Sequence, residues 1–193
     1  SAMYAVRSEG IDPANGRERF IKKNGLPTYT WDANDQVVVG DNNPDAQGSV
    51  GLNVAYKGFY LNASFMYQWG AQSYNETLLN KVENADVRGS NVDRRVLTQR
   101  WMNPGDIAPF YDMGNQTKTQ VTTRFVQDYD YFNFSGLSLG YDFSRELISK
   151  WRLRSLGLRF NMNDICRWST VKEERGTSYP FSRSFSFTLN IGI

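Results

Sequence analysis

Apolar and polar side chains alternate most regularly at the C-terminal end of the sequence. From Phe181 to Ile193 one series of positions is largely apolar, interrupted by Arg183, and the intervening series is small or polar. This two-residue period predicts a β-strand with one apolar face. The run covers 13 residues, whereas strands of soluble sheets average about 5 to 6 residues. Its length therefore favours a membrane-spanning strand.

The same period predicts a long hairpin upstream, over residues 48–69. Two alternating runs, 48–56 and 59–69, flank Lys57-Gly58, and glycine accepts the positive φ that a tight turn needs. Aromatic residues gather near the ends of both runs, where membrane barrels place their interfacial girdles. These residues are Tyr56, Phe59 and Tyr60 by the turn, and Tyr67 and Trp69 at the far end.

Three further strands complete the predicted set. Residues 129–143 alternate on both sides of a change in parity at Ser135-Gly136, which predicts a β-bulge because one extra residue reverses the register. Residues 151–163 place Arg159 among the polar positions, which is typical of a barrel lumen and poor for a soluble core. A short strand is expected at 2–8, where Tyr4 and Val6 share a face.

The predicted connections alternate between short and long. Lys57-Gly58 and residues 144–150 are short, whereas 9–46, 71–128 and 164–180 are expected to be long loops. This alternation is typical of outer-membrane barrels, with short periplasmic turns and long extracellular loops. We therefore expect residues 1–193 to form an all-β region, an antiparallel transmembrane β-barrel segment of about six strands. The alternative is a soluble β-sandwich that binds glycans without transport activity, its alternating faces closing on each other.

Composition narrows the function without choosing between these folds. The chain carries 22 basic and 20 acidic residues, interleaved along the sequence, so no one-sided basic footprint for nucleic acid is present. Histidine is absent, which removes the commonest general base and metal ligand. We expect no enzyme activity, no cofactor and no metal. Ser1-Ala2-Met3 does not resemble a signal peptide, so the chain is expected to begin within a longer protein.

Several motifs resemble a known family. The sequence runs are Gly10–Gly16, Tyr56–Phe59, Arg100–Asp106, Arg124–Asp128 leading into Leu137–Tyr141, and Tyr179-Pro180. Their order and approximate spacing, over nearly the whole chain, are similar to the C-terminal end of SusC/RagA-type TonB-linked transporters of Bacteroidetes outer membranes. One departure is Ile193, since barrels of this kind usually end in Phe.

The resemblance implies a plugged barrel of about 22 strands, of which this chain would be roughly a quarter. It implies nutrient import across the outer membrane, including carbohydrate uptake, with oligosaccharide or peptide as substrate. The implied partners are a SusD-like surface lipoprotein, outer-membrane lipid, and the TonB complex acting through an N-terminal part that this sequence lacks. With short turns on the periplasmic side, the C-terminus would also lie there.

Candidate site residues lie in the predicted long loops and motifs. Aromatic faces can stack on the apolar side of sugar rings, and the candidates for ligand contact are Trp31, Tyr74, Trp101, Tyr111 and Trp168. Packing of Trp101 within its own folded loop is the alternative, with Pro104-Gly105-Asp106 forming only a turn. The motif residues expected to have structural roles are Asp12, Pro13, Gly16, Arg100, Trp101, Pro104, Gly105, Asp106, Arg124 and Asp128.

Two sets of acidic and amide side chains carry no site prediction. Asp12, Asn15, Asp32, Asn34 and Asp35 carry oxygen ligands of the kind that calcium prefers, but their spacing does not fit an EF-hand loop, and we expect turns. Glu173-Glu174 resembles a glycosidase pair only by residue type. Its basic neighbours indicate a solvated loop.

Overall fold

The computed structural model describes residues 1–89, 92–112, 114–115, 117–171 and 183–193. Every sheet in it is antiparallel, and its helical segments are short, so the predicted all-β class is confirmed. The chain divides into two compact units, which are described separately. The sheet unit comprises Pro44–Gly70 and Tyr129–Ile193, and the loop unit comprises Ser1–Asn43 and Ala71–Asp128.

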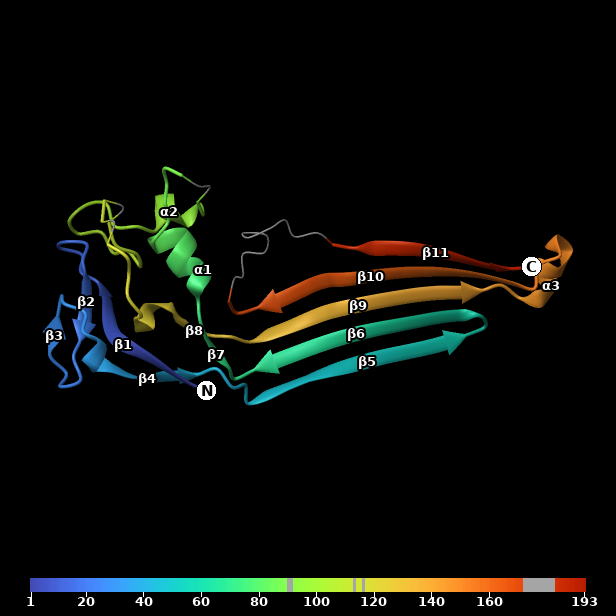
Figure 1. Cartoon of the computed structure of the whole chain (residues 1–193), viewed down its shortest axis with the longest axis horizontal. Helices are drawn as coiled ribbons and strands as arrows, with labels where there is room; N and C mark the ends of the chain where they lie inside the picture. Colours follow the sequence, from blue (N-terminus) through green and yellow to red (C-terminus); the bar gives the residue numbers. More distant parts are fainter. Residues whose placement is uncertain (90–91, 113, 116, 172–182) are drawn as a thin grey trace. The chain divides into compact units, whose positions relative to one another are not determined.

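The sheet unit is built on one five-stranded meander-like sheet (Figure 1). Its order is β11-β10-β9-β6-β5, with β11 and β5 as edges. The strands are β5 (Ala46–Tyr56), β6 (Phe59–Trp69), β9 (Tyr131–Asp142), β10 (Ser155–Ser169) and β11 (Phe185–Gly192). The predicted run 181–193 begins at Phe181 and Ser182, which lie outside the described residues.

The hairpin and the bulge that the sequence predicts are both present. Lys57 and Gly58 adopt φ of 46° and 87° between the paired residues Tyr56 and Phe59. Positive φ at both turn positions matches the right-handed twist of the strands, which is why this turn closes hairpins well. In β9 the register with β6 shifts across Ser135, so the residues on both sides of the shift present their apolar side chains to one face.

The connection between β9 and β10 is longer than expected, and this shifts the predicted strand 151–163. Helix α3 (Arg145–Ile148) continues into η4 (Ser149–Trp151), and Arg152, at φ 56°, ends the helical turn. The strand then starts at Ser155. It continues to Ser169 because a second irregularity, at Asp164 (φ 57°), lets it resume pairing with the start of β9.

The loop unit has its own sheets. A four-stranded sheet has the order β3-β2-β1-β4, and β7 pairs with β8. The strands are β1 (Ala2–Ile11), β2 (Glu18–Ile21), β3 (Pro27–Thr28), β4 (Gln36–Asp41), β7 (Gln72–Tyr74) and β8 (Val126–Asp128). The helical turns are η1 (Ala33–Asp35), α1 (Glu76–Leu78), η2 (Leu79–Glu83), α2 (Arg95–Thr98) and η3 (Thr123–Phe125).

In the loop unit the structure differs from two expectations drawn from the sequence. The strand expected at 2–8 lies in the loop unit and pairs with β2 and β4, so the large sheet has five described strands instead of six. Residues 9–46 and 71–128 are not simply loops, because they supply the other strands and the helical turns. The strands β2, β3, β7 and β8 have four residues or fewer, which leaves little local periodicity to detect.

A small hydrophobic core holds the loop unit together. Val82, Val96 and Phe125 are fully buried, and Leu78 and Phe110 pack with them. Among the described residues, no helix is both long and apolar enough to cross a membrane. In the same residues no group of three or more acidic, histidine or cysteine side chains is placed to hold a metal ion.

Candidate functional site

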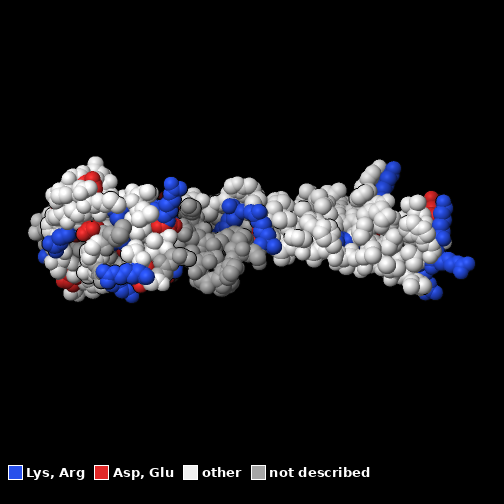
Figure 2. Space-filling view, turned by 90° about the horizontal axis from the view of Figure 1, so that it is seen from above, with Lys and Arg blue, Asp and Glu red and all other residues white. Residues whose placement is uncertain are grey.

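One face of the five-stranded sheet is continuously apolar. The strand register places Leu61 opposite Leu139, which in turn lies opposite Phe160. Outside the irregularity at Asp164, none of the described strand residues on this face is charged. The side chains are open to solvent, as Phe187 is 76% exposed and Leu52 is 51% exposed. Figure 2 shows the middle of the sheet unit largely without charged side chains on the side drawn, with basic groups toward both of its ends.

Tyrosine and tryptophan occupy only the two ends of this apolar face. At the turn end, Phe59 packs on Tyr141 with ring centroids 4.2 Å apart. At the other end, Tyr67 stacks on Trp69 at 4.7 Å, and Trp168 lies 5.9 Å from Phe132. Phe59 and Tyr67 are eight positions apart on β6, or roughly 26 Å at 3.3 Å per residue. At the tilt of about 35–45° that strands of outer-membrane barrels have, this length spans a height of about 20 Å, close to their apolar band of about 25 Å between aromatic girdles.

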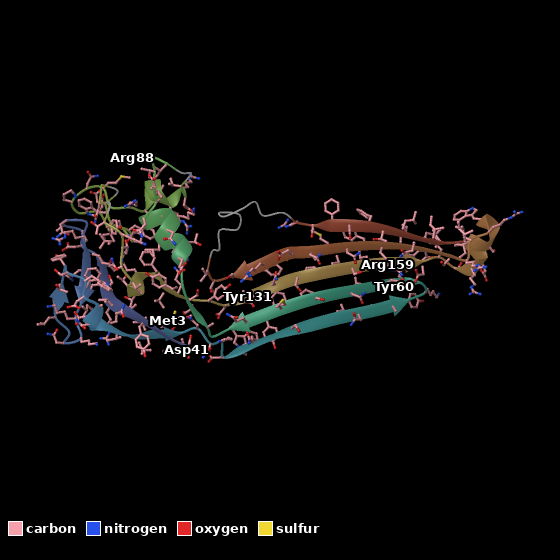
Figure 3. The ribbon with its side chains drawn as sticks, in the orientation of Figure 1. Met3, Asp41, Tyr60, Arg88, Tyr131 and Arg159 are labelled. Carbon is pink, nitrogen blue, oxygen red and sulfur yellow. The ribbon has the colours of Figure 1, made fainter. Side chains whose placement is uncertain are left out.

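The opposite face of the sheet is polar and carries an Arg–Tyr–Asp cluster near the turn end. The Arg159 guanidinium lies 4.2 Å from the centre of the Tyr60 ring, and its Nη1 is 3.1 Å from Asp142 Oδ1. The Tyr60 hydroxyl donates to the same carboxylate. The sequence predicts Arg159 on the polar face, and the structure pairs its positive charge there with Asp142. Figure 3 shows Arg159 close to Tyr60.

A second cluster lies at the other end of the same polar face. The Arg167 guanidinium is 4.3 Å from the ring centre of Tyr131 and 5.8 Å from that of Tyr129, and it donates to the Tyr129 hydroxyl. Figure 3 shows the labelled Tyr131 at the opposite end of the sheet from Tyr60. Sequence reasoning did not single out Arg167. Its place in the alternating pattern indicates the polar face only if the bulge at Asp164 is already known.

The two longest motifs of the loop unit dock on each other through Trp101. Its indole lies against Gly16, where a Cβ would come within 2.6 Å of the ring. Trp101 Nε1 donates to the Pro13 carbonyl at 3.0 Å, and the Gly105 amide donates to the same oxygen at 2.8 Å. These contacts fit the alternative in which Trp101 packs within its own unit. Position 16 favours glycine for two reasons: the Trp101 ring leaves no room for a Cβ, and the backbone φ is 67°.

The turns on both sides of this contact are closed by carboxylates. Asp106 Oδ2 accepts from the amides of Asn103 and Met102, at 2.8 and 3.2 Å, around Pro104. Asp12 Oδ1 accepts from the Ala14 amide at 2.9 Å, and Asp12 also accepts from the Tyr29 hydroxyl. The Tyr29 hydrogen bond is the main reason that the pKa of Asp12 lies below its ordinary value.

Arg100 and Tyr111 are buried beside each other. Arg100 donates to the carbonyls of Tyr111 and Asp112 at 3.0 and 2.9 Å, and burial lowers its pKa. The Tyr111 hydroxyl donates to the Thr117 carbonyl at 2.7 Å, and burial raises its pKa. With only 4% of its surface exposed, Tyr111 is placed to support the unit's interior.

Arg124 joins three segments of the loop unit. Its guanidinium pairs with Glu83 and with Glu18, the latter at 2.7 Å, and all three side chains are less than 10% exposed. Burial alone would lower the pKa of Arg124, but the hydrogen bonds and charges of the two glutamates outweigh it, so the pKa is raised. Asp128, the other charged end of this motif, accepts from Gln72 Nε2 at 3.1 Å across the β7–β8 pair.

The candidate ligand aromatics have different neighbours. Trp31 donates through Nε1 to the Val121 carbonyl at 3.2 Å, and Tyr74 packs on Phe125 with ring centres 5.8 Å apart. Trp168 belongs to the sheet unit and is 60% exposed.

The oxygen ligands near Trp31 have local roles. Asp32 caps η1 through the Asn34 amide, and Asp35 accepts from the Lys23 amide. The pairs Glu173-Glu174 and Tyr179-Pro180 lie outside the described residues.

Comparison with known proteins identifies similar solved structures. No protein-family profile matches the sequence, and no curated protein matches it. The fold is similar to a chain of the RagAB peptide importer in its open-open state, with a TM-score of 0.72 and 17% identity over 89% of this chain. A structure of the RagAB peptide transporter gives the same values, and the closed-closed importer gives a TM-score of 0.68. The chain spans about a fifth of the length of these neighbours, 19% to 20%. At this identity the similarity shows the fold.

Proposed function

We propose that this chain forms part of the wall and the external loops of an outer-membrane transporter that imports peptide or oligosaccharide. The five-stranded sheet is the wall, with its apolar face toward lipid and its polar face toward the lumen. The loop unit supplies the folded extracellular segment. The C-terminal end of β11 lies on the periplasmic side.

The observation that carries this proposal is the apolar face between two aromatic rows. A continuous apolar surface in water is unfavourable, because the free energy falls when apolar side chains leave water. In a bilayer the same surface contacts hydrocarbon, and the polar tips of tyrosine and tryptophan reach the headgroup level. The spacing of the rows supports a membrane span over any arrangement in water.

The open edges of the sheet support a larger wall. Edge strands leave rows of unpaired backbone groups, which are costly within a membrane unless another strand pairs with them. In the described part of the sheet unit, β5 and β11 each pair on one side only. Further strands of the same wall on both sides would satisfy these edges.

The substrate and partners are inferred from the similar solved structures and the sequence motifs. The similar solved structures are of a peptide importer, which favours peptide over oligosaccharide for this chain. The proposed partners are a SusD-like surface lipoprotein, outer-membrane lipid, and the TonB complex acting through a segment outside this chain. We propose transport without enzyme activity.

The alternative of a soluble glycan-binding sandwich receives no specific support. A sandwich buries the apolar face of one sheet against a second sheet about 10 Å away. The described strands of the sheet unit form a single layer whose apolar face is open.

Uptake measurements test the proposal. The gene that encodes this chain is deleted, and uptake of labelled oligopeptides and oligosaccharides is followed in the deletion strain and after complementation. We expect uptake of at least one of these classes to be lost and then restored. Unchanged uptake of both would contradict the import proposal.

A further inference from the structure

The connector between β9 and β10 concentrates basic charge at one end of the sheet. Arg145, Lys150, Arg152 and Arg154 lie within ten residues, and all four are exposed. None of them forms an ion pair with any residue that the structure describes. Within residues 143–154 only Glu146 carries a negative charge.

The same connector exposes two large apolar side chains. Leu147 is 51% exposed and Trp151 is 63% exposed. They lie in α3 and η4, one on each side of the change from α to 3-10 geometry, while Ile148 is buried and anchors the turn. Apolar side chains including tryptophan, flanked by Lys and Arg, are typical of short segments that lie in a membrane interface.

The connector is continuous with the aromatic row at the turn end of the apolar face. The Asp142 amide donates to the Gly58 carbonyl at 2.8 Å, so the β5–β6 turn lies next to the end of β9 where the connector begins. Tyr56, Phe59 and Tyr141 of the aromatic row are in the paired residues beside it. The basic groups therefore lie at the level where headgroups would meet the apolar face.

We infer that the β9–β10 connector binds the headgroups of anionic phospholipids at the membrane surface, through Arg145, Lys150, Arg152 and Arg154 around Trp151. This inference rests on the proposed membrane position of the apolar face. Guanidinium groups bind phosphate through paired charge-assisted hydrogen bonds. Each basic group near an anionic bilayer surface strengthens binding by about fivefold at moderate salt.

Photocrosslinking tests this inference. The complete gene product that contains this chain is reconstituted in bilayers with photoactivatable phosphatidylglycerol or phosphatidylcholine, and crosslinks are mapped by mass spectrometry. We expect phosphatidylglycerol to crosslink to residues 143–154 severalfold more than phosphatidylcholine does. The variant R145Q/K150Q/R152Q/R154Q should lose this excess, and raised salt should reduce it.

A matched variant removes the same charge elsewhere. Lys22, Lys23, Arg88 and Lys118 are exposed residues of the loop unit, and K22Q/K23Q/R88Q/K118Q should leave the excess unchanged. Equal crosslinking of both lipids at 143–154, with lipid still crosslinking along the apolar face, would overturn the inference and leave the proposed function standing. Absence of lipid crosslinks from the apolar face would overturn both.

Discussion

The two units of this chain differ in how far their apolar side chains are exposed. The loop unit has a buried core, with Val6, Val82 and Phe125 at 1% exposure or less, although single apolar side chains such as Ile107 remain exposed. The sheet unit lays its hydrophobic residues on one open face, where Phe187 and Leu189 are 76% and 57% exposed. The difference is that one unit encloses a core, whereas the other carries an open apolar face, which our proposal places against lipid.

The largest expected effect comes from breaking the buried charge cluster of the loop unit. Arg124→Ala leaves Glu83 and Glu18 buried without their cation, a change that costs about 3 to 5 kcal/mol. We expect amide hydrogen exchange to accelerate throughout the loop unit while the sheet unit keeps its protection. Arg88→Ala, which removes an exposed arginine of the same unit, is the control. Equal destabilisation by both variants would show that the cluster has no special role.

The next largest effect is a difference between arginine substitutions on the two faces of the sheet. Leu52 lies on the apolar face and Asn53 on the polar face of β5, midway between the aromatic rows. An arginine facing lipid near the bilayer midplane costs about 2 to 4 kcal/mol, so Leu52→Arg should lower the free energy of unfolding in lipid by that amount. Asn53→Arg should change it by less than about 1 kcal/mol. Denaturant titration in vesicles measures both, and similar losses would argue against the assignment of faces.

A smaller effect tests the contact between the two docked motifs. Gly16 and Gly25 both have positive φ, but only at Gly16 would a Cβ strike Trp101. Both alanine substitutions strain the backbone, and Gly16→Ala adds an overpacking cost of about 1 to 3 kcal/mol. Thermal unfolding of the two variants gives the difference. A difference near zero would mean that Trp101 moves away freely.

The smallest effect is a pH dependence of the Asp12 turn. Because the folded state lowers the pKa of Asp12, its stabilising contribution is present above the unfolded-state pKa, near 3.8, and is lost as pH falls through the folded value. We expect exchange of the Ala14 amide, which donates to this carboxylate, to accelerate over that range. Tyr29→Phe removes the hydrogen bond that contributes most to the shift and should move the transition to higher pH. An unchanged transition would contradict this cause.

The sheet unit is far easier to predict from sequence than the loop unit. Each of its strands carries its own two-residue period, so Val50 to Tyr56 and Phe59 to Trp69 indicate their pairing without reference to distant residues. The parity change at Ser135 even predicts the bulge. The main error is at the start of β10, because Trp151 lies in a helical turn. Its parity already differs from that of Leu156 and Leu158, so the two-residue period begins only near Ser155.

The loop unit depends on contacts that leave no local pattern. Arg124 pairs with Glu18, 106 positions away, and the Val6 amide donates to the Val121 carbonyl. Trp101 illustrates the same limit, because its residue type fits both a ligand platform and an interior side chain. Its contacts with Gly16 and the Pro13 carbonyl account for its packing, and contact with a ligand stays a prediction.

Accessibility along β5 tests the membrane position of the apolar face most directly. Spin labels are placed one at a time at positions 50 to 56 of the reconstituted protein, after Cys166→Ser, and collisions with oxygen and with a water-soluble nickel complex are measured. We predict that Val50, Leu52 and Val54 are accessible to oxygen from lipid, and that Gly51, Asn53 and Ala55 are accessible to the nickel complex. Equal nickel access at both sets of positions would contradict the account.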